Sequence, residues 1–168
     1  MPVDNHNEQF YLVDKRDRPI GKIPRSKAHS SSQYIHRSIC ILVLNNKSQL
    51  LLQKRSKNKD TYPNFWTLSV TGHVTYGQTY LQAAKRELCE ELGLVIPLKR
   101  LNKILLTLPN EIEFCTIYQA VVSSSKITSN RQEISSTTWV NISLLRLFVN
   151  QNSLTPDALQ ILTYLKYL

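Results

Sequence analysis

The chain has 168 residues, a length typical of one domain and sufficient to bury a hydrophobic core without staples. Hydrophobic residues make up 42% and charged residues 20%, which is ordinary for a globular protein, and no apolar run is long enough to span a bilayer. The formal net charge is +9, with twelve Lys or Arg against five Asp or Glu in the first 60 residues. This bias favours anionic partners such as phosphorylated small molecules, phospholipid or nucleic acid. The sequence lacks the interleaved aromatic and basic residues of a nucleic-acid module, which argues against that partner without excluding it.

Localisation and cysteine usage give two further expectations. The start, MPVDNHNEQFYLVD, lacks the basic-then-apolar pattern of a secretion signal, so we expect a cytoplasmic protein. Three cysteines is an odd count, and their spacing suits neither a zinc site nor a disulfide framework. We therefore expect Cys40, Cys89 and Cys115 each to act as a small buried hydrophobic residue. The oligomeric state is not set by the sequence.

Strands are predicted for most of the first third of the chain. QFYLVDKRDRPIGKI is typical of two short strands around a turn with Pro19 and Gly21, and SKAHSSSQ predicts a polar loop. YIHRSICILVLNNKSQLLLQKR predicts a hairpin whose turn runs from Asn45 to Ser48. SKNKDTYPNFW then predicts a basic loop that ends in aromatic residues. TLSV is short and apolar and predicts a buried strand.

After Gly77 the hydrophobic pattern becomes helical. Apolar residues recur at three- and four-residue steps, at Leu81, Ala84, Leu88 and Leu92. Gly93 is expected to end this helix. Three strands are then expected within LVIPLKRLNKILLTL, EIEFCTIYQAVVS and ISSTTWVNI. The tail predicts helices over 143–150 and 155–168, the second with Thr155 as N-cap and Asp157 in its first turn. The pattern predicts a single α/β domain over residues 1–168, with a mixed sheet covered by helices.

The central helix gathers three carboxylates. Glu87, Glu90 and Glu91 lie three and four residues apart, so they share one helix face, where like charges repel. A multivalent cation among them would relieve that repulsion. Mg²⁺ binds oxygen ligands in this way and usually keeps waters for a phosphate-bearing substrate. A solvated acidic helix face explains the same spacing equally well, so spacing alone leaves both interpretations open.

The stretch that contains these glutamates resembles a Nudix box, G-x5-E-x7-R-E-U-x-E-E-x-G-U, where U is a bulky aliphatic residue. Gly72 opens the pattern here, and RELCEELGL, which includes Gly93, completes it. The match is long and its spacing is specific. One position departs from the family: Gln78 stands where the pattern has its first glutamate and cannot supply that charge.

Membership of the Nudix family would imply an α/β/α sandwich with a mixed sheet and a loop-helix-loop box. The resemblance also implies that Glu87, Glu90 and Glu91 hold a divalent metal, Mg²⁺ or Mn²⁺, against a diphosphate. By the same resemblance, Glu87 or Glu91 is the catalytic base, and Arg86 braces the carboxylates.

A second group of residues has metal-ligand chemistry. Three of the four histidines are His29, His36 and His73, and Glu111 and Glu113 lie two apart on an expected strand, so they point the same way. Imidazole and carboxylate together suit Mn²⁺, Mg²⁺ or Zn²⁺. Spacing alone does not join residues so far apart in the chain, and a lone histidine is more often structural.

Three segments resemble type 1 isopentenyl-diphosphate isomerase, a branch of the Nudix superfamily. They are RSKAHSSSQYIHRS, LLLQKRSKNKDTYPNFWTLSVTGHVTYGQ and NEIEFCTIYQA, in the same order as in that enzyme, within a resemblance that runs from about Val13 to Trp139. The resemblance implies that the three histidines and two glutamates form one metal site. It also implies that Arg55 and Lys59 bind a diphosphate, and Arg25 falls at a further basic position. Arg offers a forked pair of donors and Lys a point charge. Solubility is the alternative role for Arg55 and Lys59, and for Arg25 it is the favoured one.

Two positions depart from the isomerase. That enzyme has a cysteine directly before its GH, where this chain has Thr71, and a hydroxyl is a far weaker acid than a thiol. The isomerase also uses a C-terminal tryptophan to face a carbocation, and the tail NSLTPDALQILTYLKYL contains none. Trp139 is expected to pack in the core, which leaves Tyr164 or Tyr167 as possible substitutes.

The leading prediction is a metal-dependent Nudix hydrolase that cleaves a phosphoanhydride bond in an organic or nucleoside diphosphate derivative. Glu133, just before an expected strand, is a further candidate for the base. The second hypothesis is an isopentenyl-diphosphate isomerase that uses the His/Glu metal site. The third is a non-catalytic module that binds a phosphorylated ligand or RNA. The sequence does not identify the substrate or the metal.

Overall fold

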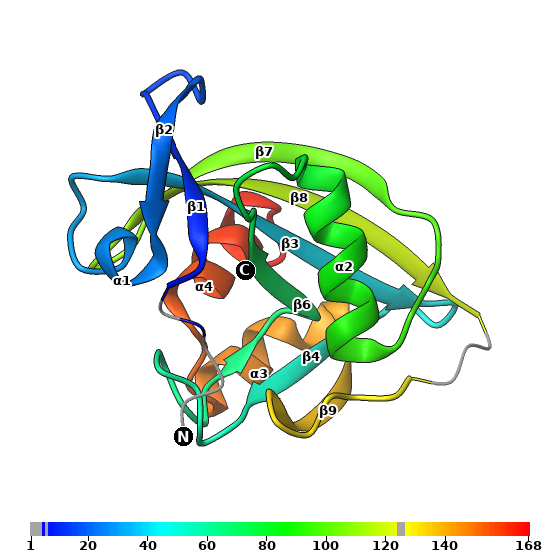
Figure 1. Cartoon of the computed structure of the whole chain (residues 1–168). Helices are drawn as coiled ribbons and strands as arrows, with labels where there is room; N and C mark the ends of the chain where they lie inside the picture. The colour runs from blue at the N-terminus through cyan, green and yellow to red at the C-terminus, as the bar shows by residue number, and fades with distance from the viewer. Residues whose placement is uncertain (1–4, 6, 124–126) are drawn as a thin grey trace.

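The computed structural model describes residue 5 and residues 7–123 and 127–168, and a nine-stranded mixed sheet forms its centre (Figure 1). The strands are β1 (Gln9–Val13), β2 (Pro19–Pro24), β3 (Ile35–Asn45), β4 (Gln49–Arg55), β5 (Trp66–Thr67), β6 (Val70–His73), β7 (Lys99–Thr107), β8 (Ile112–Val122) and β9 (Ile134–Asn141). The helices are α1 (Arg25–Ala28), α2 (Tyr80–Leu92), α3 (Leu145–Gln151) and α4 (Pro156–Tyr164), with a 3-10 turn at Ile142–Leu144. Among these described helices none is both long and apolar enough to cross a membrane. The N-terminal stretch used to judge a secretion signal lies partly outside the described residues.

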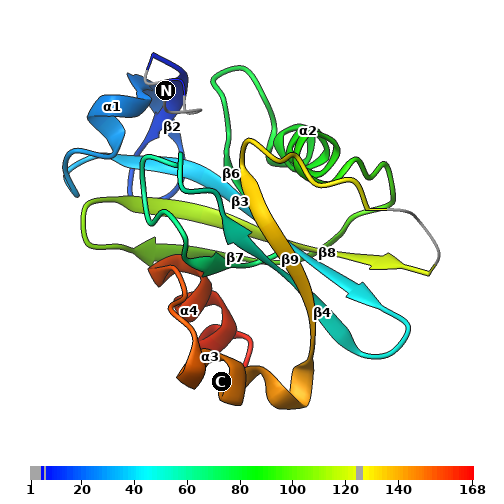
Figure 2. The ribbon, with the colours of Figure 1, turned by 90° about the horizontal axis from the view of Figure 1, so that it is seen from below.

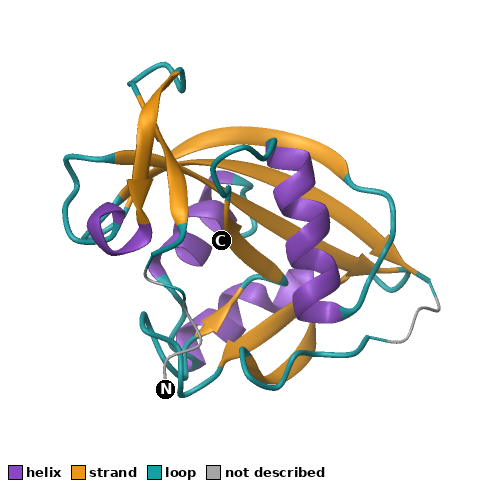
Figure 3. Ribbon diagram, viewed as in Figure 1, coloured by secondary structure: helices purple, strands orange, loops and turns teal. Residues whose placement is uncertain are grey.

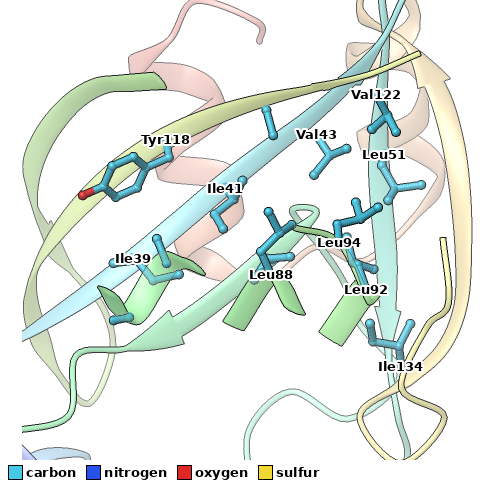
Figure 4. Packing of buried hydrophobic residues seen from close by; sticks show 14 of the residues in the cluster. Ile39, Ile41, Val43, Leu51, Leu88, Leu92, Leu94, Tyr118, Val122 and Ile134 are labelled. Atoms are coloured by element: carbon cyan, nitrogen blue, oxygen red, sulfur yellow. The ribbon is translucent and has the colours of Figure 1, made fainter. Parts of the chain in front are cut away.

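Helices cover both faces of the sheet. α2 lies on one face and α3 and α4 lie on the other (Figures 2 and 3). Alternate residues of a strand point to opposite faces, so β3 sends Ile39 and Ile41 into the cluster beneath α2 and Cys40 and Leu42 into the cluster beneath α4. Figure 4 shows Leu88 of α2 packed against the first of these clusters. The predicted α/β/α sandwich with a mixed sheet is confirmed.

β3 organises the sheet because it pairs on both edges. It runs parallel to β8 from Ile35 opposite Ile112 onward, and antiparallel to β6 from Ser38 opposite His73. Its pairing with β4 is confined to Leu44 opposite Leu50, next to the turn. Farther along, β4 pairs with β5 at Gln53 and Lys54, while β9 pairs with the other edge of β4 along its whole length. The predicted hairpin therefore exists, but its strands part, and β6 occupies the edge of β3 that β4 leaves.

Ser69 bridges the two strands where they part. Its hydroxyl donates to the carbonyl of Leu51 at 2.6 Å and accepts from the amide of Val43 at 2.8 Å. Because Ser69 is fully buried, this side chain supplies hydrogen bonds that the strand ladder no longer provides. The single strand predicted for TLSV is accordingly wrong: the segment is split between β5 and β6.

The ends of α2 follow the sequence signals. Thr79 is the N-cap of a capping box: its side chain accepts from the amide of Gln82, and the Gln82 side chain accepts from the amide of Thr79 at 2.8 Å. Gly93 ends the helix in the left-handed conformation with φ of 65°, as predicted. Both ends of the helix that carries the box glutamates are therefore fixed.

Three further local predictions were wrong. Part of the predicted polar loop is α1, because Ala28 is fully buried against Phe10 and Ile23. Cys89 is exposed, since it follows the buried Leu88 by one position and so faces outward, whereas the other two cysteines are buried.

The third correction concerns the end of a helix. Leu81 lies in α2 as its spacing predicted, and its side chain is 41% exposed. α4 ends at Tyr164 rather than at the last residue. Thr155 does occupy the N-cap position of α4, but its hydroxyl donates to the hydroxyl of Thr67 at 2.9 Å instead of capping the helix.

Replacing Gly93 with Ala is expected to lower the free energy of unfolding by about 1 kcal/mol or more, because a side chain is strained at its φ of +65°. Gly21→Ala is the matched control: no atom lies within 4 Å of the Cβ it would add, and we expect a change of less than about 0.5 kcal/mol. Urea unfolding measures the free energy of unfolding of both variants. Equal losses in the two variants would show that the helix end does not require glycine.

Candidate active site

A cavity of about 240 Å³ brings the predicted site residues together. All of the residues predicted to bind metal or diphosphate line this cavity except His36, which is fully buried beside it. Gly72 and Arg86 of the box pattern also line it, whereas Gly93 lies at the far end of α2. Residues from α1, α2, α4, five strands and the β4–β5 loop therefore share one hollow.

Strand register places the imidazoles and carboxylates. His36 on β3 lies opposite Glu113 on β8, and His73 at the end of β6 lies opposite Ser38, two residues along β3. Glu111, which precedes β8 by one residue, points to the same side as Glu113. His29 comes from the C-cap of α1. Side chains distant in the sequence thus meet because three strands are paired.

The distances within this group are short. Nε2 of His29 lies 3.2 Å from Oε2 of Glu111 and 3.1 Å from Nε2 of His73. Nε2 of His36 lies 3.5 Å from Oε2 of Glu111 and 3.4 Å from Oε2 of Glu113. Ligating atoms of His29, His36, His73 and Glu111 all lie within 4.8 Å of one another, and Glu113 borders the group.

The chemistry of this cluster fits a divalent cation. His36 is fully buried, yet neither of its ring nitrogens has a hydrogen-bond partner among the described residues. Burial, assisted by the charge of Glu113, raises the pKa of Glu111 to about 8, and burial and Arg25 hold the pKa of His73 well below its usual range. Converging imidazoles and crowded carboxylates need a partner, and a cation supplies one.

Phe10 of β1 closes one side of the cluster. Its ring lies 4.6 Å from that of His73, 5.5 Å from that of His36 and 5.9 Å from that of His29, measured between centroids. This apolar ring restricts the orientation of the imidazoles and excludes water from that side, which strengthens their electrostatic interactions.

The box glutamates approach the same cavity from α2. A Cβ on Gly72 would collide with the carboxyl group of Glu87, so the glycine gives this carboxylate its place against β6. Arg86 pairs with Glu87 and with Glu90, each at 2.9 Å, and donates to the carbonyl of His73 at 3.2 Å. Arg86 therefore ties the acidic face of α2 to the strand that carries the histidine.

Burial separates the two interpretations of the acidic face. The side chain of Glu90 is 53% exposed and fits a solvated face. Glu91 is 5% exposed and accepts a hydrogen bond from Gln53 at 2.7 Å. Burial raises the pKa of Glu91 well above its usual range and that of Glu87 to about 7. Charging both of these neighbours is unfavourable without a cation, so a solvated face does not describe them.

Basic residues line the side of the cavity formed by the end of β4 and the loop that follows it. Arg55 donates to the carbonyl of Thr61 at 2.9 Å and to its hydroxyl at 3.1 Å, which fixes the guanidinium. Lys59 lies 3.4 Å from Glu133, so this further carboxylate also borders the cavity.

Arg25 reaches the cavity from α1. It is only 7% exposed, and its guanidinium lies 3.2 Å from Nδ1 of His73 and 3.5 Å from Asp60. A residue buried in a cavity wall does not serve solubility, so that alternative for Arg25 is wrong.

The residues that differ from the isomerase also have defined places. Thr71 lines the cavity and lies opposite Cys40 on β3. Tyr164 accepts a hydrogen bond from Asn102 outside this cavity, and Trp139 packs against the cluster beneath α2.

Asp157 lines the cavity as well. Its sequence signals placed it only in the first turn of a helix, and no pattern indicated what that helix covers.

The protein-family model described as the NUDIX domain matches residues 34–163 of this chain. Isopentenyl-diphosphate Delta-isomerase 2 of Photorhabdus laumondii is 36% identical over 156 residues, which cover 90% of this chain and 85% of that protein. The prenyl-diphosphate phosphatase of Methanosarcina mazei is 34% identical, with 77% of each chain covered. The crystal structure of a Deinococcus radiodurans protein superposes with a TM-score of 0.82 at 26% identity, covering 94% of this chain and 98% of that one.

Calorimetric titration with Mn²⁺ tests the His/Glu cluster. We expect His29→Ala to weaken binding by about tenfold or more, because removing even a partner of a metal ligand commonly has that effect. Ser26→Ala, an exposed change on the same short helix, is the matched control and should bind as the unaltered protein does. Equal Mn²⁺ affinity in both variants would remove His29 from the ligand set.

Proposed function

The chain belongs to the NUDIX domain family, and we propose that it is a metal-dependent hydrolase that cleaves the phosphoanhydride bond of an organic or nucleoside diphosphate. One observation carries the proposal: buried carboxylates, clustered imidazoles and basic side chains line a single cavity. The first two attract cations, and the third attracts phosphate oxygens. A cavity of this composition suits a substrate that presents a metal-bound diphosphate.

The chain's residues divide into two binding groups under this proposal. Glu87, Glu90 and Glu91 hold one cation, and the His29, His36, His73, Glu111 and Glu113 cluster holds another, with Mg²⁺ or Mn²⁺ as the ions and Zn²⁺ as a further candidate for the cluster. When bound, such ions neutralise phosphate charge and lower the pKa of water. Arg55, Lys59 and Arg25 bind the diphosphate oxygens and fix its direction in the cavity.

Hydrolysis requires one water molecule and one base. The water oxygen forms a bond to phosphorus while the bond from phosphorus to the bridging oxygen breaks, and the leaving phosphate keeps that electron pair. Glu87 or Glu91 accepts the proton released by the water. Both side chains line the cavity, and burial raises the pKa of each in the absence of a bound cation. Glu133, paired with Lys59, is the alternative base.

Organic diphosphates are the first candidates for the substrate. Two of the matched relatives are named for reactions of isopentenyl and prenyl diphosphates, which supports this class. The cavity volume, about 240 Å³, lies below the usual range of small-molecule pockets and favours a short organic group.

Isomerisation of isopentenyl diphosphate is the second candidate, and the five clustered His and Glu residues favour it. Thr71 opposes it because a hydroxyl does not replace a thiol in proton transfer. Cys40 lies opposite Thr71, but burial raises the pKa of its thiol well above the usual range, so it is a poor substitute. A non-catalytic module that binds a phosphorylated ligand or RNA is the third candidate, favoured by Gln78 and the net charge of +9.

Phosphate release from a panel of prenyl and nucleoside diphosphates, with Mg²⁺ or Mn²⁺, tests hydrolysis. We expect Glu91→Gln to reduce kcat/KM by about 100-fold or more, because a buried carboxylate that binds a cation or accepts a proton is lost. Lys85→Gln, an exposed change on α2, is the control and should keep full activity. If the unaltered protein releases phosphate no faster than Glu91→Gln does, the proposal is defeated.

Incubation in heavy water distinguishes a hydrolase from an isomerase. We expect no deuterium in isopentenyl diphosphate recovered after incubation in D₂O with Mg²⁺, because the cavity offers a threonine hydroxyl at the position of the thiol. Mass spectrometry of the recovered diphosphate measures this directly. Deuterium uptake at a rate comparable to phosphate release would favour the isomerase instead.

A further inference from the structure

The β1–β2 hairpin and α1 form a unit with few backbone links to the rest of the sheet. β2 pairs with no strand other than β1 among the described residues. β1 in turn pairs with β3 only at Val13 opposite Ile35, and near its start it bonds to the loop before α2 through Gln9 and Phe10. The unit also has a small hydrophobic cluster of its own. Its orientation therefore depends on contacts other than strand pairing.

The backbone links to the sheet and to the loop all lie on β1, so by themselves they leave the hairpin free to turn about that strand. α1 follows β2 directly and ends at His29, so such a turn would move the cavity residues that α1 carries. The turn of the hairpin and α1 lie at opposite ends of the unit (Figure 1). Arg25 holds the α1 end through His73 and Asp60, and the opposite end needs a contact of its own.

Asp17 supplies that contact from the turn between β1 and β2. Its side chain is 5% exposed, and its carboxylate accepts from Nε of Arg37 at 2.6 Å, from the hydroxyl of Tyr80 at 3.0 Å and from Nζ of Lys103. Arg37 also donates to the backbone carbonyl of Asp17 at 2.7 Å. The three partners belong to β3, α2 and β7, so one carboxylate joins the hairpin to three other elements.

The turn does not by itself require this carboxylate. The φ of Asp17 is +60°, in the left-handed region that suits glycine better. A buried ion pair also adds little net stability, because the loss of solvation offsets the attraction. What the pair supplies is a fixed direction: the Arg37 guanidinium lies over the rings of Tyr11 and Tyr80, at 4.8 and 5.2 Å from their centroids.

We propose that Asp17 is a positioning residue for the His/Glu cluster: it fixes the hairpin against β3 and α2, and thereby places Arg25 and His29. This inference rests on the proposed function, because the cluster is the second cation site of that proposal. Tyr80 is the first residue of α2, which carries the box glutamates. The same carboxylate therefore also sets the spacing between the two ion-binding groups, and it acts through the hairpin rather than by touching a cation or a substrate.

A double-mutant cycle followed by calorimetric titration with Mn²⁺ tests this inference. Asp17→Asn removes the charge but keeps a residue that tolerates the left-handed turn, and we expect it to weaken binding by about fivefold or more. In the His29→Ala protein the same change should weaken binding by less than about twofold further, because the ligand that Asp17 places is already gone. Tyr80→Phe, which removes one of the donors to Asp17, should cause a smaller loss in the same direction.

Asp14→Asn is the matched control, since Asp14 lies in the same turn and pairs with Arg18 within it. We expect this variant to bind Mn²⁺ as the unaltered protein does.

Amide hydrogen exchange of the metal-free protein gives a readout that is independent of the cation. The amides of His29 and Ser30 donate to carbonyls of α1, and we expect them to exchange about fivefold or more faster in Asp17→Asn. The amide of Gly93, at the far end of α2, should exchange at an unchanged rate.

Unchanged Mn²⁺ affinity in Asp17→Asn, or an equal loss in both backgrounds of the cycle, would overturn the inference even if the melting temperature fell. If His29→Ala binds Mn²⁺ as tightly as the unaltered protein, the proposed cation site fails, and exchange of the α1 amides decides whether Asp17 places α1. Neither measurement involves turnover, so a lack of hydrolysis would defeat the proposed function alone.

Discussion

The pairing of β3 on both of its edges is the constraint on which the site depends. Register with β8 sets His36 beside Glu113, and register with β6 brings His73 two residues along the same strand. A slip of one residue in either ladder would turn these side chains to the opposite face. The early parting of β4 leaves the edge of β3 to β6, and β6 in turn supplies Gly72, against which Glu87 lies. Backbone hydrogen bonds thus determine the positions of the charged side chains.

Electrostatic strain is the second common feature of the site. The carboxyls of Glu87, Glu91 and Glu111 all have raised pKa values, and burial is the largest cause for each. Crowded acids of this kind destabilise a fold by themselves, so their retention points to a ligand that compensates them. Arg86 is the basic side chain that pairs with Glu87, and Arg25, Arg55 and Lys59 line other parts of the cavity. A divalent ion would balance the carboxylates, and a diphosphate would balance the basic side chains. Neither ligand could balance both sets of charges alone.

Much of the fold follows from local patterns in the sequence. Alternation predicted the strands, and the spacing of Ala84, Leu88 and Leu92, with Gly93 after them, predicted α2 and its end. The parting of β3 and β4 was not predictable, because it depends on Ser69 bonding to both strands rather than on any property of the hairpin itself. Likewise, α1 forms because tertiary packing buries Ala28.

The site was predictable only in part. The box residues lie close in sequence, so their spacing carried information, whereas a family resemblance was needed to group His29 with Glu111. Asp157 had a helix-start pattern that says nothing of the cavity it lines. One arrangement has a consequence for the site: Phe10, Arg25 and His29 all precede residue 34, where the match to the family begins. The segment before the domain match therefore supplies one of the three imidazoles of the cluster and the aromatic ring that packs against them.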